Sequence, residues 1–361
     1  MQKNPSKLIY ISLFALISTL KLDAQVIRKY SNEFLNIGVG AGALGMSNAT
    51  IASTNDVTSA YWNPAGLTQI ETNMEVGLMH ASYFASIAQY EYGGVGFKIN
   101  DESAGGFTYL RFGVDNIPNT SDLIDANGNI NYNNITSFSA VDNAFLFSYA
   151  RKIGSIDGLS VGGSAKIIYR KVGDFANAWG FGLDFGAQYK VNNWRFAAMG
   201  RDITSTFSAW SFNLDQFKNV YAATGNAMPT NSLEISLPRI ILAGGYNFTI
   251  NKIFGIYPEL NLDMTFDGKR NTLISSNFTS IDPHFGVQFH YKNMVFLRAG
   301  VGNIQKEIKD KGETTTLQPN IGVGIKIKRV SLDYALTNVG NTSSAIYSNI
   351  FSLKIGVNRS R

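Results

Sequence analysis

The sequence of 361 residues contains no cysteine, which excludes disulfide bridges and thiolate-bound metal sites. Only 16% of its residues are charged, whereas a soluble domain carries about 25%. Its three histidines, His80, His284 and His290, offer little material for a catalytic or metal-binding site. In place of these residues the chain has 35 glycines and 12% aromatic residues, a composition that indicates an outer-membrane β-barrel.

The sequence also lacks an apolar run of the roughly 20 residues that a membrane-spanning helix needs. The apolar run at residues 8–20 follows Lys3 and Lys7 and comes shortly before Ala24, a small residue suited to cleavage. A charged start, a short apolar core and a small residue at the cut are the features of a secretory signal peptide. We therefore expect residues 1–24 to be a signal peptide and the mature chain to begin at Gln25.

An excess of charge of one sign is missing as well. Removing the expected signal peptide takes away Lys3, Lys7, Lys21 and Asp23, so that 31 basic and 26 acidic residues fall to 28 and 25. The mature net charge is then 28 minus 25, or +3, and the chain has no runs of lysine or arginine. Such a balance gives no reason to expect binding to nucleic acid.

Alternation of apolar with small or polar residues indicates β-strands. Within residues 179–189, apolar side chains occupy every odd position and glycine or polar residues occupy every even one. Successive side chains of a strand point to opposite faces, so one face of this segment is apolar and the other is small or polar. A tilted strand of about 9–11 residues can cross the hydrocarbon layer of a membrane. We expect the apolar face to meet lipid.

Fourteen segments have this strand-like character. They are residues 73–81, 84–98, 105–115, 140–151, 159–172, 177–190, 193–203, 236–249, 255–266, 283–291, 294–302, 318–327, 330–338 and 348–357. Short connections alternate with mostly longer ones, as periplasmic turns and extracellular loops do in bacterial barrels. We predict an all-β protein with a 14-stranded antiparallel transmembrane β-barrel over residues 73–357 and a short periplasmic tail at 358–361. The alternative, a soluble β-sandwich, would have strands of about five or six residues and an inward apolar face.

Residues 38–47 contain Gly40, Gly42 and Gly45 in the spacing G-x-G-x-x-G, which occurs in dinucleotide-binding loops. That motif requires a following helix within a βαβ unit. Here small polar and β-branched residues follow the glycines, and no βαβ alternation comes after them. An exported protein also has little access to a nicotinamide cofactor. We expect neither a nicotinamide nor any other cofactor.

Residues 34–67, FLNIGVGAGALGMSNATIASTNDVTSAYWNPAGL, resemble the N-terminal signature of the PorV/PorQ family of Bacteroidota outer-membrane proteins. That family is associated with the type IX secretion system and belongs to the wider FadL-like class of 14-stranded barrels. Two positions depart from its pattern, because the family commonly has arginine where this chain has Gly42 and glycine where it has Ser47. The departures indicate a divergent paralogue and leave the choice of partner open.

The resemblance implies that residues 25–72 fold into the barrel lumen as a hatch. Asn63 and Pro64 would form its anchoring turn, since Asn-Pro favours turns and proline fixes φ. The glycines would pass close to lumen side chains, where a Cβ would collide. The hatch motif comprises Gly38, Gly40, Gly42, Gly45, Trp62, Asn63, Pro64, Ala65 and Gly66. An N-terminal loop with an ordinary turn is the alternative.

The strand face opposite the lipid carries a few ionisable residues. The lumen-facing candidates are Asp184, His284, His290, Arg298, Asp333 and Lys354. His284 and His290 lie six positions apart, about 20 Å along an extended strand, which is too far for one metal ion. We therefore expect residues that line a wet lumen and pair across it, with no catalytic residue and no metal site.

The predicted loops at 116–139 and 204–235 mix Asn, Asp, Ser and Thr with Ile, Leu, Phe and Tyr. Long loops on a rigid scaffold often carry binding, and solvated variable loops are the alternative. By resemblance, we expect a non-enzymatic protein that assists type IX secretion. Its partners would be outer-membrane lipid, translocon or attachment-complex subunits, and cargo proteins. A FadL-like transporter of hydrophobic small molecules is the alternative, and a lipid-modifying outer-membrane enzyme is a third.

Overall fold

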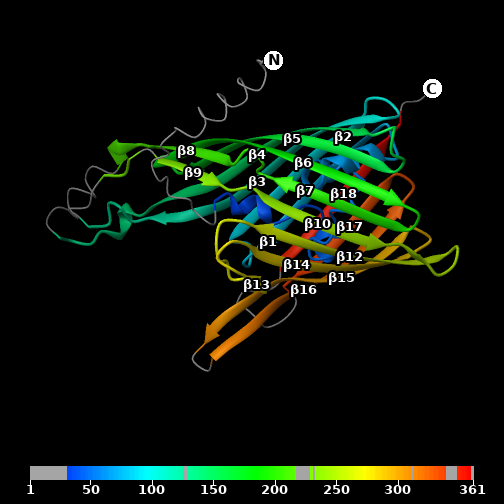
Figure 1. The fold of residues 1–361 in the computed structure, drawn as a ribbon. Coiled ribbons are helices and arrows are strands. Elements are labelled where there is room, and N and C mark those ends of the chain that lie inside the picture. Colours follow the sequence, from blue (N-terminus) through cyan, green and yellow to red (C-terminus); the bar gives the residue numbers. More distant parts are fainter. Residues whose placement is uncertain are drawn as a thin grey trace, which may run out of the picture.

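The computed structural model describes residues 31–124, 128–216, 228–230, 232–309, 312–338 and 348–358. These residues form a closed antiparallel β-barrel with a short N-terminal segment inside it (Figure 1). Within the described residues, no helix is long and apolar enough to span a membrane. The expected signal peptide at residues 1–24 lies outside the described part of the chain, as do residues 359–361 of the expected tail.

Fourteen strands make up the wall, and each pairs antiparallel with the next wall strand along the chain. β1 also pairs with β18, which closes the barrel. The wall strands are β1 (Met74–Tyr83), β2 (Ala88–Lys98), β3 (Ser103–Asn119), β4 (Thr136–Lys152), β5 (Leu159–Val172), β6 (Ala176–Val191), β7 (Trp194–Arg201), β10 (Arg239–Tyr246), β12 (Phe254–Thr265), β14 (Ser280–Tyr291), β15 (Val295–Lys309), β16 (Gly312–Ile327), β17 (Val330–Thr337) and β18 (Ser348–Val357). The predicted 14-stranded antiparallel barrel is confirmed.

Shorter strands extend this wall. They are β8 (Thr206–Phe212), β9 (Ser232–Ser236), β11 (Phe248–Thr249) and β13 (Ile274–Ser275). β8 continues beyond β7 along the same neighbour, β6, and pairs with β9. The predicted loop at 204–235, which contains β8, and the predicted single strand over residues 236–249 are both wrong. Pro238, which has no N–H to donate to a ladder, separates β9 from β10.

Three hairpins continue beyond the wall at one end of the barrel. β3 and β4 stay paired as far as Asn119 and Thr136, and β15 and β16 stay paired as far as Lys309 and Gly312. β8 and β9 form the third hairpin. Figure 1 shows the β15–β16 hairpin, in orange, projecting far from the rest of the wall. The opposite end has short turns, such as residues 192–193 and 328–329.

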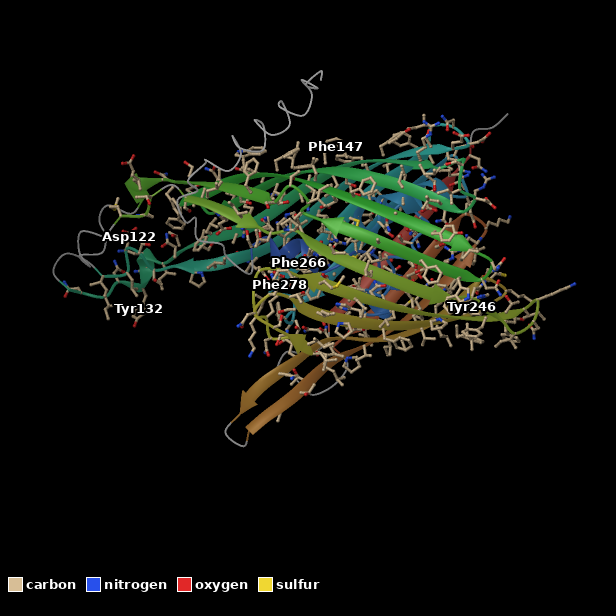
Figure 2. All side chains as sticks on the ribbon, viewed as in Figure 1. Asp122, Tyr132, Phe147, Tyr246, Phe266 and Phe278 are labelled. Carbon is tan, nitrogen blue, oxygen red and sulfur yellow. The ribbon has the colours of Figure 1, made fainter. Side chains whose placement is uncertain are left out.

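The outer surface of the wall is apolar along the strands. On β6, Trp179, Phe181 and Phe185 are 56, 40 and 50% exposed, whereas Asp184 between them is 5% exposed. Figure 2 shows side chains standing outward from the wall, Phe147 among them. An apolar surface of this extent is stable against lipid, and a closed wall satisfies the strand hydrogen bonds there. The chain is therefore a transmembrane barrel.

Residues 31–72 fold inside the wall, and we call them the plug. The plug contains η1 (Glu33–Asn36), α2 (Ala41–Gly45), α3 (Ser59–Trp62) and η2 (Pro64–Gln69). Its apolar residues, such as Phe34 and Leu44, are buried in one cluster with wall residues such as Leu110 and Met199. The G-x-G-x-x-G motif forms α2, a helix of five residues, and the chain then continues within the plug. All strand pairs among the described residues are antiparallel, so no βαβ unit follows the motif there.

Candidate functional site: a plugged lumen with two cavities

The plug divides the lumen into two cavities. The outer cavity, at the end with the three hairpins, has a volume of about 1050 Å³. The inner cavity, at the end with the short turns, has a volume of about 450 Å³. Leu44 and Ser47 line the outer cavity, while Ala43 and Met46 line the inner one. Because these four residues are close in sequence, a single layer of chain, residues 40–48, separates the two spaces; we call it the partition.

Glycines of the wall leave room for the partition. A Cβ added at Gly300 would lie 2.3 Å from the carbonyl carbon of Met46, and one added at Gly286 would lie 2.6 Å from its oxygen. A Cβ added at Gly45 would lie 2.9 Å from the Cα of Gly322. The partition therefore packs against the backbone of β14, β15 and β16, and a larger residue at any of these positions would force it away.

The other hatch glycines serve different purposes. Gly38 and Gly40 have φ values of +103° and +84°, which residues with a side chain rarely adopt. A Cβ at Gly42 would lie 3.1 Å from the guanidinium carbon of Arg298. Gly42 is the position at which the PorV/PorQ family commonly has an arginine. In this chain Arg298, an arginine of the wall, lies beside that position.

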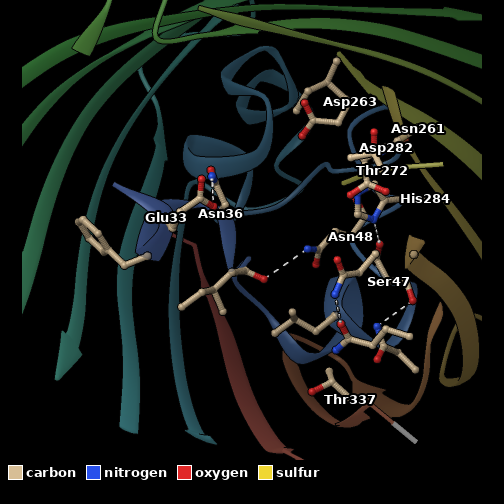
Figure 3. A pocket seen from close by; sticks show the side chains of 18 of the residues that line it. Glu33, Asn36, Ser47, Asn48, Asn261, Asp263, Thr272, Asp282, His284 and Thr337 are labelled. Carbon is tan, nitrogen blue, oxygen red and sulfur yellow. Dashed lines mark hydrogen bonds and ion pairs between the residues drawn. The ribbon is translucent and has the colours of Figure 1, made fainter. Parts of the chain in front are cut away.

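Three wall side chains hold the turn at Ser47 and Asn48, whose φ values are 52° and 68°. Nδ1 of His284 lies 2.8 Å from the carbonyl oxygen of Ser47, and the amide of Asn320 donates to the Ser47 hydroxyl at 2.7 Å. The amide of Asn261 donates to the carbonyl oxygen of Asn48 at 2.9 Å. Figure 3 shows His284 and Asn261 above this turn. Left-handed backbone is uncommon for serine, so these bonds stabilise a conformation that the chain would otherwise avoid.

The turn at Asn63 is fixed to the wall by its own side chain. The amide of Asn63 donates to the carbonyl oxygen of Ala187 at 3.1 Å and accepts from the N–H of Ala65 at 3.2 Å. Pro64 begins η2, and a Cβ at Gly162 of β5 would lie 2.7 Å from the nitrogen of Ala65. This turn therefore contacts both β5 and β6.

Gly66 and Trp62, the remaining residues of the hatch motif, pack within the plug. A Cβ at Gly66 would lie 2.4 Å from the carbonyl oxygen of Thr54. The indole N–H of Trp62 donates to the carbonyl oxygen of Val39 at 2.9 Å. The bond from Trp62 joins the second half of the plug to the first, while the close approach at Gly66 packs the second half against itself.

A network of charges joins the plug to β15, β17 and β18. Nζ of Lys354 lies 2.5 Å from a carboxylate oxygen of Asp56 in the plug and 3.8 Å from one of Asp333. Arg298 completes the network at 2.6 Å from Asp333. Burial raises the pKa of the Asp56 carboxyl, but the attraction of Lys354 and the hydrogen bonds from Lys354 and Thr58 outweigh it and hold that pKa below its usual range. The structure thus brings together three of the residues that the sequence assigns to the lumen.

Asp184 belongs to a separate buried cluster. Nζ of Lys166 lies 2.8 Å from Asp184 and 2.5 Å from Asp202. Lys166 was not among the predicted lumen residues, although it lies on the small and polar face of β5 with Ser160 and Ser164, and that alternation could have revealed it. Glu259, which is 1% exposed and accepts the N–H of Ala52 at 2.7 Å, was not predicted either. Both residues hold buried polar groups of the lumen in place.

The floor of the outer cavity is mostly apolar and aromatic. Phe34, Leu44, Tyr61 and Trp62 of the plug line it. Arg201 of β7 lies with its guanidinium carbon 4.6 Å from the ring centre of Tyr61, and it donates to the carbonyl oxygen of Tyr61 at 3.3 Å. Cation–π contact and hydrogen bond together fix the aromatic floor to the wall.

The two lumen histidines lie in different cavities. His284 lines the outer cavity and His290 the inner one, where its ring centre is 6.4 Å from that of Phe296. His80 is exposed beside Glu91, at 2.7 Å. The part of the chain that the structure describes contains no group of three or more His, Cys, Asp or Glu residues placed to hold a metal ion.

Comparison with known proteins found no matching family model and no matching curated protein. Solved structures do resemble the chain. The CymD monoaromatic hydrocarbon channel matches with a TM-score of 0.57 and 13% identity over 90% of this chain and 98% of its own. The Pseudomonas putida toluene transporter TodX matches with a TM-score of 0.56 and 12% identity over 89% and 98%. The Ralstonia pickettii toluene transporter TbuX matches with a TM-score of 0.55 and 13% identity over 89% and 99%.

At this low identity, the likeness shows the fold alone. That fold is the closed antiparallel barrel of FadL-like outer-membrane channels, which agrees with the wider class that the sequence resemblance indicated. The structures found are channels and transporters rather than enzymes. None of these three is described as a PorV/PorQ protein.

Proposed function

We propose that this chain is a non-enzymatic outer-membrane barrel that admits small hydrophobic molecules from outside the cell. The outer cavity carries this proposal, because its volume of about 1050 Å³ is enough for a ligand-sized molecule. Phe34, Leu44, Tyr61 and Trp62 give it an apolar floor, and most of its other lining residues are polar or charged. Small-molecule sites combine apolar surface with polar groups that fix the orientation of the ligand.

The similar solved structures support the same class of cargo. Their titles describe a monoaromatic hydrocarbon channel and two toluene transporters. In this chain the partition lies between the outer and inner cavities, so passage toward the inner end requires residues 40–48 to move. An N-terminal signal peptide would export the chain before it inserts into the outer membrane.

Uptake of labelled toluene by cells tests the proposal. A strain that lacks the chain should accumulate toluene more slowly than its parent, and the intact chain should restore the rate. Ile37 is another apolar residue that lines the outer cavity. Ile37→Asn, which places a polar amide there, should not restore the rate, whereas Ile124→Asn on an exposed hairpin should. Equal accumulation in all five strains would contradict the proposal. The folded protein should be recovered from the outer-membrane fraction and migrate faster on a gel before heating than after.

Assistance to type IX secretion is the second candidate. The projecting hairpins β3–β4, β8–β9 and β15–β16 favour it, because they offer large surfaces outside the wall for a translocon subunit, an attachment-complex subunit or a cargo protein. Residues 34–67, which resemble the PorV/PorQ signature, favour it as well.

Two experiments distinguish the two candidate functions. Deleting the gene and profiling the culture supernatant and cell surface tests secretion, and normal delivery of all proteins with a type IX C-terminal signal would exclude that role. Shortening the β15–β16 hairpin by replacing residues 306–315 with a tight turn removes surface outside the wall and spares the residues that line the cavities. Secretion would then fail while toluene uptake continues, if the hairpins serve a partner.

A further inference from the structure

One side of the outer cavity is lined by neighbouring polar residues of β12 and β14. Asn261 is paired in register with His284, and Asp263 with Asp282. Residues two apart on a strand point to the same face, so these four side chains form a compact square on the lumen face. Figure 3 shows them gathered on one side of the pocket, opposite Glu33 and Asn36. We call these four residues the acceptor wall.

The acceptor wall has more hydrogen-bond acceptors than donors. Oδ1 of Asn261, of Asp263 and of Asp282 is buried, and none of the three has a hydrogen-bond partner among the described residues. Asn261 is only 2% exposed and lines the cavity, while its amide nitrogen already donates to Asn48. Buried acceptors in native proteins are nearly always satisfied, so three on one small surface indicate a missing donor.

His284 adds a fourth acceptor to this surface. The carbonyl oxygen of Ser47 can only accept, so Nδ1 of His284, 2.8 Å away, carries the proton of the neutral ring. Nε2 lies 3.5 Å from Oδ2 of Asp282, a distance at which the protonated ring forms an ion pair with that carboxylate. In the neutral ring Nε2 is an acceptor, and the two facing acceptors then need a donor between them.

Arginines line the outer cavity as well, and they pair with most of its carboxylates. Glu33, Asp142 and Asp263 each lie within 3.6 Å of an arginine guanidinium. Within the described part of the chain, Asp282 pairs with no lysine or arginine, and its side chain is 26% exposed. Rotation of its carboxylate about the soft χ2 angle would turn an oxygen into the cavity. Asp282 is therefore the lining carboxylate that a cationic ligand would reach.

We propose that the acceptor wall binds the ammonium group of a small amphipathic amine, whose apolar part lies on the floor of the outer cavity. This inference rests on the proposed function and narrows its cargo. An ammonium group supplies three donors on one positive centre, which matches the surplus of acceptors on this wall once the carboxylates turn toward the cavity. A carboxylate head group would bring further acceptors to a surface that already lacks donors.

Four probes with one apolar part and different head groups test the proposal. They are phenethylamine, which is protonated at pH 7, 2-phenylethanol, phenylacetate and ethylbenzene. Dissociation constants are measured by calorimetry on the purified barrel in lipid nanodiscs. A charge-assisted hydrogen bond makes phenethylamine the tightest ligand, with a dissociation constant about tenfold or more below those of phenylacetate and ethylbenzene.

Variants of the cavity acids decide which residue is responsible. Asp282→Asn should abolish the preference for phenethylamine, and Asp282→Glu, which keeps the charge, should retain most of it. Asp142→Asn is the matched control, because Asp142 lines the same cavity but is already held by Arg170 at 2.8 Å. The shift between heated and unheated samples on a gel shows whether each variant is folded.

The outcomes also separate this inference from the function on which it rests. Tight binding of phenylacetate, or a preference for phenethylamine that survives in Asp282→Asn, would overturn the acceptor wall as an ammonium site. Equal binding of all four probes would overturn it too, while leaving the outer cavity as a hydrophobic site. If none of the four binds, ethylbenzene included, the proposed uptake function fails together with the inference.

Discussion

A single methyl group at Gly300 would test how the partition is held. The Cβ of alanine there would lie 2.3 Å from the carbonyl carbon of Met46, whereas ordinary contacts begin near 3.4 Å. The wall strand cannot yield easily, because Gly300 is paired on both sides, with Gly286 and with Asn320. The partition must therefore move by about 1 Å, which is the difference between the two distances.

The expected effect of Gly300→Ala follows from the energetics of overpacking. Extra methyl groups in a well-packed interior cost about 1–3 kcal/mol. Each 1.4 kcal/mol is a factor of ten in an equilibrium constant, so docking of the partition should weaken about fivefold to about 150-fold. The backbone amides of Leu44, Ser47 and Asn48 bond within the partition and report its opening. Their hydrogen-exchange rates should rise by the same factor.

Hydrogen exchange followed by mass spectrometry measures this effect. Gly244→Ala is the control, because the added Cβ would meet only the Phe196 ring, at an ordinary 3.7 Å. Both variants should keep the faster migration of unheated barrel on a gel, which shows that the wall is intact. Exchange in residues 40–48 that is the same in Gly300→Ala as in Gly244→Ala would refute the packing of the partition against β15.

Three further predictions concern the plug and the wall. The pKa of Asp56 lies below its usual value of about 3.9, so its bond to Lys354 stabilises the plug above that pH and is lost as the pH falls through the lowered pKa. Hydrogen-exchange protection of residues 54–58, corrected for the pH dependence of the intrinsic exchange rates, should be constant from about pH 5 to 8 and fall in stronger acid. In Asp56→Asn this protection should be lower and should not change with pH. Asn63→Leu removes the amide that donates to the carbonyl oxygen of Ala187, so the free energy of hydrogen-exchange protection of η2 should fall by about 1–3 kcal/mol. Unchanged protection of η2 would contradict its anchoring through Asn63. Phe185→Lys places a charge on the lipid face in mid-strand and should lower the free energy of folding into bilayers by about 2–4 kcal/mol, whereas an equal yield of folded barrel would contradict the lipid-facing assignment.

The wall could be predicted because lipid and lumen impose different residues on alternate positions. β6 runs from Ala176 to Val191, and the alternation in the sequence predicted residues 177–190. Where a strand leaves the membrane, this constraint disappears. Residues 303–317 show no apolar alternation, yet most of them belong to the β15–β16 hairpin, because backbone pairing continues without a lipid face.

The site could be predicted only where its contacts are local. Asn63 bonds to Ala65, two residues away, and Asn-Pro is a turn signal that the sequence displays directly. The partners of the partition are Gly286, Gly300 and Gly322, more than 230 residues further along the chain. Alternation shows that these glycines face the lumen, but it does not show which strand meets the plug, because that depends on barrel closure. For the same reason the sequence placed Lys354 in the lumen without its partner Asp56.

The plug is attached to two different parts of the wall, and this arrangement bears on both proposed functions. α2 contacts β15, β16, β17 and β18, whereas η2 contacts β2 to β6. Release of α2 would join the outer and inner cavities, while η2 could stay anchored through Asn63. Gly300→Ala should therefore raise exchange in residues 40–48 and leave residues 63–69 protected. If both segments exchanged together, the plug would open as one body, and the uptake route would require its displacement rather than movement of the partition alone.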